Sequence, residues 1–250
     1  MAEPILSTRA LRKSFGALKV TDGVSLDIRA GELHAIIGPN GAGKTTLIQQ
    51  LSGNLPSDSG HVLYRGEDIT ALSMEQRARR GIARSFQITS ILAGFCVLEN
   101  VALAVQARSG SSFRFFGRAD REAALNAQAM DALRAVGLEV RAEAIAGHLS
   151  HGEKRQLELA LALATRPALL LLDEPLAGTS HEESAALIAL MRRLKARHTI
   201  VLIEHDMEAV FALADRVSVL VYGAVLMTGA PHAVRADAKV REAYLGEEGG

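Results

Sequence analysis

The sequence predicts an α/β fold with a mostly parallel sheet covered by helices, an antiparallel β subdomain near the amino end, and an inserted helical subdomain. Strand-like and helix-like segments alternate over residues 4–87 and again from Ala168, which is typical of such sheets. The stretch between them, from about Leu98 to Ala164, has a helical pattern. A glycine-rich segment, residues 38–45, follows a short apolar strand and precedes a helix.

Length and composition limit the class of protein. At 250 residues the chain forms one domain, or one domain with a sizeable insertion, and it can bury a full core. Lys plus Arg and Asp plus Glu both number 28, so no overall field attracts nucleic acid, and we expect no nucleic-acid partner. Cys96 is the single cysteine, which excludes an internal disulfide and fits a reducing cytosol.

No segment reads as a membrane or export signal. The first residues lack a basic segment followed by an apolar core, so we expect no signal peptide. Apolar runs such as Leu169 to Leu172 are far shorter than the roughly 18 to 20 residues that span a bilayer. We therefore expect any membrane role to go through partners.

Hydrophobic periodicity and turn residues place the elements in order. Strands are expected over Ile5–Phe15, Val24–Ile28, His34–Ile37, His61–Tyr64, Ile82–Phe86, Leu169–Leu172, Thr199–Ile203 and from Arg216 on both sides of Gly223. Helices are expected over Thr46–Leu51 and Asp206–Ala214, and from the capping-box pair Ser73 and Gln76 to about Arg80. Two further helices are indicated by apolar residues at helical spacing. These residues are Ala129, Ala132, Leu133 and Val136, in a helix that ends at Gly137, and Leu187, Leu190, Met191 and Leu194.

The glycine-rich segment reads Gly38-Pro39-Asn40-Gly41-Ala42-Gly43-Lys44-Thr45, with Thr46 directly behind it. It fits the phosphate-binding pattern G-x-x-x-x-G-K-[ST]. Glycines let several amide N–H groups point at one anion, and the positive end of the following helix adds to that field. Lys44 is expected to reach the β- and γ-phosphates, and the Thr45 hydroxyl to ligate Mg²⁺.

Two carboxylates, Asp173 and Glu174, follow the strand Leu169–Leu172. Ligands bind at the carboxyl ends of strands in open α/β sheets, so these acids are placed to act on a bound nucleotide. We expect Asp173 to hold Mg²⁺ through its water shell and Glu174 to act as the general base on the attacking water. The alternative is a solvated acidic turn after a core strand.

The segment Leu149-Ser150-His151-Gly152-Glu153 opens another helix. Ser150 and Glu153 form a capping box, and the helix start is a second place where an anion can bind. The spacing alone favours only a well-capped helix. In the insertion, residues 109–118 carry three phenylalanines and are expected to form a surface loop. Packing of this loop on its own domain is favoured over a docking patch for a partner, because aromatic side chains are more often buried.

These motifs occur in the order found in ATP-binding-cassette (ABC) ATPases, a family of P-loop NTPases. The matching segments are Gly38–Thr46, Gln87, Leu149–Glu153, Leu169–Glu174 and His205, which resemble the Walker A loop, Q-loop, signature, Walker B motif and switch histidine. The resemblance covers essentially all 250 residues. Finer details are similar to the ATPase of branched-chain amino-acid importers, namely residues 81–87, 98–101, 203–207 and 243–246.

The resemblance implies roles for individual residues. Cassettes of this kind dimerise head to tail, which implies that Ser150 and Gly152, with Glu153 in the same segment, meet the γ-phosphate held by the partner's Walker A loop. An aromatic stacks on adenine at the position of Phe15. Gln87 is implied to touch Mg²⁺ and the attacking water, and His205 to hold the γ-phosphate and Glu174 in register. The preference for ATP comes from the family, because stacking on Phe15 tolerates any base.

The resemblance further implies an ATPase that energises an importer from the cytoplasmic face of the membrane. The expected partners are a second cassette (the same chain or a related one), two transmembrane permease subunits and, indirectly, an external solute-binding protein. Residues 1–250 are expected to form one cassette, with 1–87 and 161–250 as the catalytic lobe and 88–160 as the helical insertion. Alternatives are the ATPase of a lipopolysaccharide exporter, a soluble cassette acting on ribosomes or chromosomes, and a cassette that binds ATP with little turnover.

Two departures from the family pattern concern the signature and the D-loop. The commonest signature has glycine at position 151 and glutamine at 153, whereas this chain has His151 and Glu153. We expect these replacements to affect the rate more than the existence of the site. The D-loop segment Ala177–Ser180 lacks the usual aspartate at its end, which bears on coupling between subunits.

Overall fold

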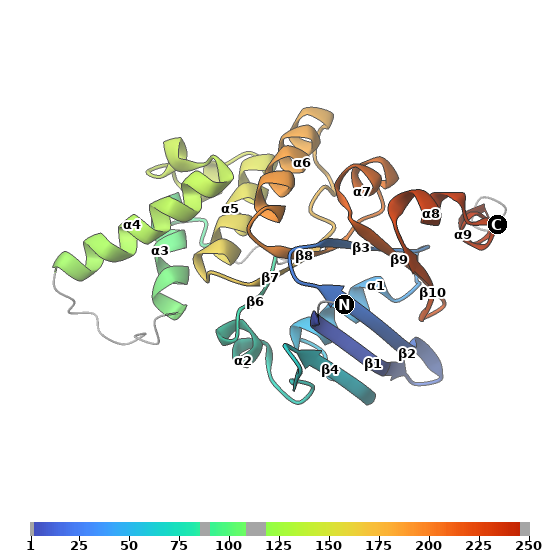
Figure 1. The fold of residues 1–250 in the computed structure, drawn as a ribbon. Coiled ribbons are helices and arrows are strands. Elements are labelled where there is room, and N and C mark those ends of the chain that lie inside the picture. Colours follow the sequence, from blue (N-terminus) through green and yellow to red (C-terminus); the bar gives the residue numbers. More distant parts are fainter. Residues whose placement is uncertain (1–2, 86–90, 109–118, 246–250) are drawn as a thin grey trace.

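The computed structural model describes residues 3–85, 91–108 and 119–245 (Figure 1). The predicted Gln87 and the phenylalanine-rich segment 109–118 lie outside these residues. The strands are β1 Pro4–Phe15, β2 Leu18–Arg29, β3 Leu33–Ile37, β4 Ser59–Tyr64, β5 Glu67–Asp68, β6 Ile82–Arg84, β7 Leu169–Asp173, β8 Thr199–Ile203, β9 Arg216–Val221 and β10 Ala224–Gly229. The helices are α1 Lys44–Ser52, α2 Met74–Arg79, α3 Val97–Arg108, α4 Ala119–Val136, α5 His151–Ala164, α6 His181–Lys195, α7 Met207–Leu213, α8 Pro231–Ala236 and α9 Ala238–Leu245.

Among the described residues, the central sheet has six strands in the order β10-β9-β3-β8-β7-β6. All neighbouring pairs are parallel except β9 and β10, which form an antiparallel hairpin. A second, antiparallel sheet has the order β2-β1-β4-β5. The α/β fold with a mostly parallel sheet and an amino-terminal antiparallel subdomain is therefore confirmed.

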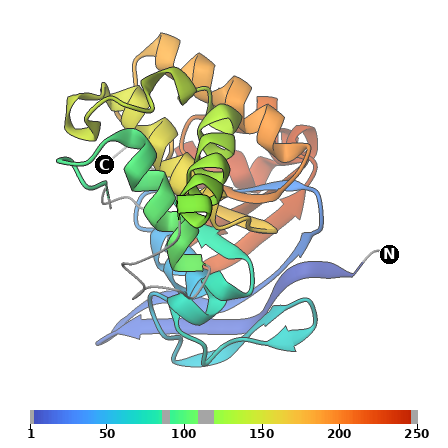
Figure 2. The ribbon, with the colours of Figure 1, turned by 90° about the vertical axis from the view of Figure 1, so that its left-hand side faces the viewer.

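The central sheet lies between two layers (Figures 1 and 2). Helices α5, α6 and α7 cover one face, and α1 with the antiparallel sheet covers the other. Successive side chains of a strand point to opposite faces, so Leu170 and Leu172 of β7 pack with the first layer and Leu169 and Leu171 with the second. Both faces are buried, which explains why β7 and β8 read as continuous apolar runs.

The helical insertion is built from α3, α4 and the start of α5, which pack against one another. Helix α4 ends before Gly137, whose φ of 76° lies in the left-handed region that favours glycine at a helix end. Helix α5 continues through residue 160, where the sequence places the end of the insertion, and reaches the face of the sheet. The boundaries 88 and 160 stay a prediction.

Two local details differ from or extend the sequence expectations. Strand β6 ends at Arg84, two residues before the predicted Phe86. Ser85 N–H still donates to Leu171 O (3.0 Å), so sheet-like pairing continues one residue beyond the strand. Within the described ranges, no helix combines the length and apolarity that crossing a membrane requires.

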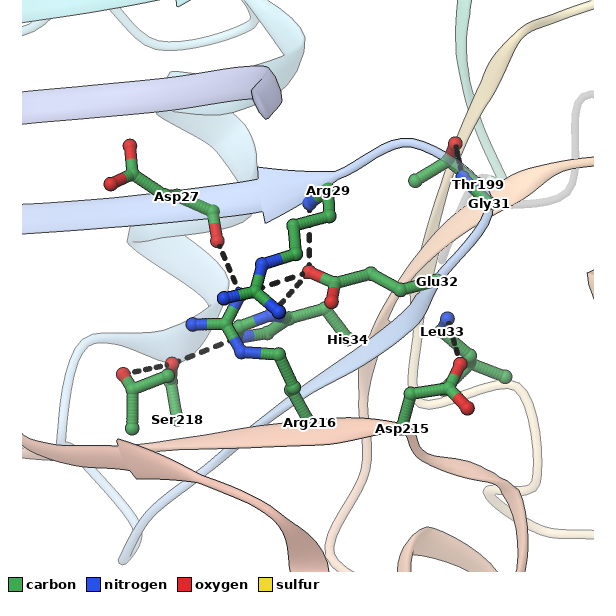
Figure 3. A network of polar contacts seen from close by, with 11 residues as sticks. Asp27, Arg29, Gly31, Glu32, Leu33, His34, Thr199, Asp215, Arg216 and Ser218 are labelled. Carbon is green, nitrogen blue, oxygen red and sulfur yellow. Dashed lines mark hydrogen bonds and ion pairs between the residues drawn. The ribbon is translucent and has the colours of Figure 1, made fainter. Parts of the chain in front are cut away.

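A buried polar network joins the amino end of β3 to its neighbours (Figure 3). His34 is fully buried, and its ring nitrogens lie 3.1 Å from Glu32 Oε1 and 2.8 Å from Ser218 Oγ. The same Glu32 oxygen accepts hydrogen bonds from Arg29 N–H (2.8 Å) and the Arg216 guanidinium (3.3 Å). The network therefore fixes β3 at the end opposite the glycine-rich loop.

Candidate functional site

The carboxyl ends of three adjacent parallel strands carry the predicted site. The glycine-rich loop follows β3, His205 follows β8, and Asp173 and Glu174 lie at the end of β7. Because β8 lies between β3 and β7, the sheet order brings these three segments to one edge. Ligands bind at this edge in open α/β sheets.

Close backbone contacts require glycine at two positions of the loop. A Cβ atom on Gly38 would lie 2.0 Å from Leu220 O, and one on Gly43 would lie 2.2 Å from Val20 O. Gly43 also has a φ of 97°, where L side chains are strained. The loop is thus held between β9 and β2, and its shape depends on glycine.

The start of α1 fits an anion. Gly43 occupies the N-cap position without a side-chain cap, and the first turn contains no acidic residue. The first N–H groups of a helix need partners, and the helix dipole favours a negative one. Lys44 lies across the loop, where its Nζ donates to Gly38 O (2.6 Å) and Pro39 O (2.9 Å). These features match what a polyphosphate requires.

Asp173 is buried and paired with Arg84 of the neighbouring strand. Its Oδ2 lies 2.9 Å from the Arg84 Nη2, and the aspartate side chain has no exposed surface. Burial raises the pKa of Asp173 above its usual value, although the Arg84 charge opposes this shift. Asp173 Oδ1 is buried and accepts no hydrogen bond from the residues that the structure describes.

The residues present fit Mg²⁺. Mg²⁺ prefers oxygen ligands, keeps several of its waters, and commonly binds through one or two carboxylates and the phosphates of a nucleotide. The unpartnered Oδ1 of Asp173 is an acceptor for such a water shell, and Thr45, in the first turn of α1, supplies a hydroxyl.

Glu174 adopts a left-handed backbone conformation with φ of 47°. Such a conformation costs a non-glycine residue about 1–3 kcal/mol, and residues strained in this way cluster at active sites. The turn is fixed on both sides, because Glu174 N–H donates to Ile203 O (2.9 Å) and Glu174 O accepts from Ala177 N–H (3.1 Å). The backbone therefore turns sharply at the residue that the sequence predicts as the base.

The sequence reasoning missed Glu204 as a site residue. Its carboxylate is fully buried and accepts hydrogen bonds from Leu176 N–H (2.8 Å) and His205 N–H (3.1 Å). Burial raises the pKa of Glu204, and these hydrogen bonds oppose the rise. Glu204 thus joins the loop after β7 to the loop after β8. An acid directly behind the apolar run Thr199–Ile203 is the signal that would have identified it.

Two predicted site residues are exposed. The His205 side chain is 65% exposed, with Nδ1 3.7 Å from Glu204 Oε2, so its ring lies open to solvent at the edge of the site. Phe15 is 52% exposed at the end of β1, and Lys13 Nζ lies 5.6 Å from the centre of its ring. An aromatic ring open to solvent is available for stacking on a base.

The predicted capping box at the start of α5 is confirmed. Glu153 N–H donates to Ser150 Oγ (3.2 Å), and Ser150 N–H donates to Glu153 Oε2 (2.8 Å). Arg141 Nε lies 2.9 Å from the other Glu153 oxygen. The Glu153 of this chain is therefore occupied in holding its own helix start.

The start of α5 contacts residues that follow β7 in the sequence. His151 Nε2 lies 3.4 Å from Ala177 O, and Gly152 N–H donates to Glu183 Oε1 (3.0 Å). Ser180 and Glu183 form another capping box, at the start of α6, which the sequence reasoning also missed. The S-x-x-E spacing would have identified it.

Comparisons with known proteins identify the family of the chain. The model of the ABC transporter family matches residues 21–177, and that of the branched-chain amino acid ATP-binding cassette transporter matches residues 224–250. The chain is 37% identical to the high-affinity branched-chain amino acid transport ATP-binding protein BraF of Pseudomonas aeruginosa and 37% identical to LivG of Escherichia coli. Each alignment covers 99% of this chain and 100% of the relative.

Solved structures show the same fold. The ADP conformation of MJ1267, an ATP-binding cassette of an ABC transporter, superposes with a TM-score of 0.85 at 31% identity, covering 97% of this chain and 98% of that one. A nucleotide-free cassette from an ABC transporter gives 0.84 at 30% identity, covering 96% and 98%. The chain belongs to the ABC transporter family and is an ATP-hydrolysing cassette of the branched-chain amino-acid transporter type.

Proposed function

We propose that this cassette powers the import of branched-chain or related amino acids, with ATP bound at the edge formed by the ends of β3, β8 and β7. The observation that carries the proposal is the meeting of the glycine-rich loop, the carboxylates of β7 and His205 at that edge. The loop N–H groups and Lys44 hold the phosphates, and Phe15 stacks on the adenine. Thr45, Asp173 and Gln87 would hold Mg²⁺, which would neutralise phosphate charge.

Glu174 and His205 act on the attacking water. Glu174 accepts a proton from the water as it attacks the γ-phosphate, and His205 orients the γ-phosphate and the carboxylate. The sharp turn at Glu174, with φ of 47°, supports this role because it fixes where the side chain leaves the strand. Glu204 positions the two loops through its hydrogen bonds to Leu176 and His205.

A second cassette completes each site in this proposal. The start of α5, with Ser150 and Gly152, offers N–H groups and a hydroxyl to an anion. In the described part of the chain the start of α5 contacts Arg141, Ala177 and Glu183, and none of these three belongs to the glycine-rich loop, which supports a role toward the loop of another subunit. ATP between two cassettes draws them together, and hydrolysis releases them. The partner is a second copy of this chain or a related cassette.

The remaining partners follow from the relatives. BraF and LivG are named as ATP-binding proteins of high-affinity branched-chain amino acid transport. By that likeness the chain attaches to two transmembrane permeases at the cytoplasmic face of the membrane, and an external binding protein delivers the solute. Closure of the cassette pair moves the helical insertion and thereby the permeases.

Purification of the tagged chain from its native membranes in a mild detergent, followed by mass spectrometry, tests the proposal. We expect two polytopic permeases and a second cassette to co-purify. Permeases of a lipid exporter would contradict amino-acid import, and ribosomal or chromosomal partners without permeases would contradict transport altogether.

A further inference from the structure

The carboxylate of Glu183 holds the start of α5 in this chain. Gly152, the second residue of α5, donates its N–H to Glu183 Oε1 at 3.0 Å. The approach is close, because a Cβ on Gly152 would lie 2.6 Å from the same oxygen. An N–H in the first turn of a helix has no partner within the helix, so it binds whichever acceptor is present.

The two oxygens of Glu183 serve different partners. Oε2 accepts a hydrogen bond from Ser180 N–H (3.0 Å) and completes the capping box of α6, whereas Oε1 accepts one from Gly152 N–H. A cap requires one oxygen only, so the contact to α5 is additional to the cap. The hydrogen bonds from Ser180 and Gly152, together with the charge of His151, lower the pKa of Glu183, and the group is an anion at neutral pH.

The proposed function assigns the Gly152 N–H to the γ-phosphate of the partner's ATP. One N–H cannot serve both anions at full strength, and two anions at one helix start repel each other. We propose that Glu183 is a positioning residue that accepts the phosphate-binding N–H of Gly152 while the chain is not paired with a second cassette. Glu183 thereby sets the ATP concentration at which the two cassettes close. This inference rests on the proposed function.

The neighbouring residues provide matched controls. Glu182 lies in the same first turn of α6 and is exposed, and no contact of its side chain with Gly152 is recorded in the described part of the chain. Glu182→Gln therefore removes the same charge without touching α5. Ser180→Ala removes the cap hydroxyl but keeps the Glu183 carboxylate, which separates loss of the cap from loss of the contact.

The test uses the full chain carrying Glu174→Gln, in which we expect a closed pair to persist because ATP is not hydrolysed. Sedimentation velocity measures the ATP concentration at half-maximal dimer, and thermal melting measures stability. Glu183→Gln removes the charge and leaves one carbonyl oxygen, so the Gly152 N–H faces either a neutral acceptor or none. We expect it to lower the half-maximal ATP concentration about tenfold, because hydrogen bonds to a charged group are about twice as strong as neutral ones. Glu182→Gln should leave it unchanged.

The possible results distinguish failure of the Glu183 role from failure of cassette pairing. A half-maximal ATP concentration that is unchanged or raised by Glu183→Gln, in a chain that still dimerises with ATP, overturns the role of Glu183 alone. An equal decrease in Glu182→Gln overturns it too, because the effect would then be one of general charge. A parent chain that binds ATP but forms no dimer at any concentration overturns the pairing of two copies of this chain, and with it the closure that Glu183 is proposed to control.

Discussion

At the scale of single residues, the buried ion pair Arg84–Asp173 holds a predicted site carboxylate in place. Arg84 lies on β6 and Asp173 at the end of β7, and their side chains are 8% and 0% exposed. The sequence identifies Asp173 from its place behind an apolar strand. It does not reveal Arg84, because the partner comes from a strand 89 positions away in the chain.

Replacing Arg84 by leucine should destabilise the fold by about 3–5 kcal/mol at pH 8, since it leaves a buried charge without its partner. The pKa of Asp173 is already raised by burial, and loss of the arginine charge raises it further. The folded state then prefers the neutral acid, so the deficit should shrink as the pH falls toward that raised pKa. Urea denaturation at pH 8 and pH 5 measures this.

Arg79→Leu is the control for that measurement. Arg79 pairs with Glu75 on the surface of α2, where both side chains are at least 70% exposed. Exposed pairs of this kind contribute roughly 0–1 kcal/mol. A deficit in Arg84→Leu no larger than in Arg79→Leu would contradict the importance of the buried pair.

Glu174→Gln should keep ATP binding and abolish steady-state hydrolysis. The amide preserves the size of the side chain but cannot take a proton from water, and general-base catalysis contributes about 10²–10⁴-fold. Phosphate release and nucleotide affinity are measured on the same preparation. Turnover at the wild-type rate would remove Glu174 from its role, whereas loss of nucleotide binding would show that the substitution disturbs the loop.

At the scale of elements, local chemistry made most boundaries predictable. The capping boxes at Ser73 and Ser150 are confirmed, as is the end of α4 before Gly137. The largest boundary difference is in β2, which runs over Leu18–Arg29 although the alternating pattern indicates only Val24–Ile28. Strand β6 ends at Arg84, and the predicted end at Phe86 lies outside the described residues. Local pattern marks Glu183 and Glu204 as candidates, but their contacts to Gly152 and Leu176 were not predictable, since only the folded chain brings these segments together.

The network at the amino end of β3 gives a pH-dependent prediction. Burial alone raises the pKa of Glu32, but hydrogen bonds from His34 and Arg29 N–H outweigh it, so the pKa lies below its usual value. An acid with a lowered folded pKa adds stability above its unfolded pKa of about 4.5 and loses it as the pH falls through the folded value. Glu32→Gln should therefore cost about 1–3 kcal/mol at pH 7.

That cost should shrink below about pH 4.5, and denaturant unfolding of both chains between pH 7 and pH 4 measures it. Glu75→Gln provides the control, because its carboxylate is 72% exposed and paired only at the surface. A cost for Glu32→Gln that stays constant over this range would mean that the charge of Glu32 contributes nothing to the network.

At the scale of the whole molecule, the sheet order decides which predicted residues meet. The motifs are spread from residue 38 to residue 205, and the order β3-β8-β7 brings three of them to one edge. Sequence pattern identified each motif, and the known arrangement of parallel sheets predicted the common edge. The start of α5 does not follow from this strand order. In this chain it contacts Ala177 and Glu183, which follow β7 in the sequence, and its proposed ligand belongs to another subunit.

Complementation between two inactive variants tests the shared site most directly. Lys44→Ala removes the phosphate-binding lysine, and Ser150→Arg blocks the start of α5. In a head-to-tail pair, a mixed dimer of these variants has one site in which the loop and the helix start are both intact. We predict that the variants mixed before ATP addition recover hydrolysis that neither shows alone. A mixture that stays inactive, beside an active wild-type chain, would contradict a site shared between two cassettes.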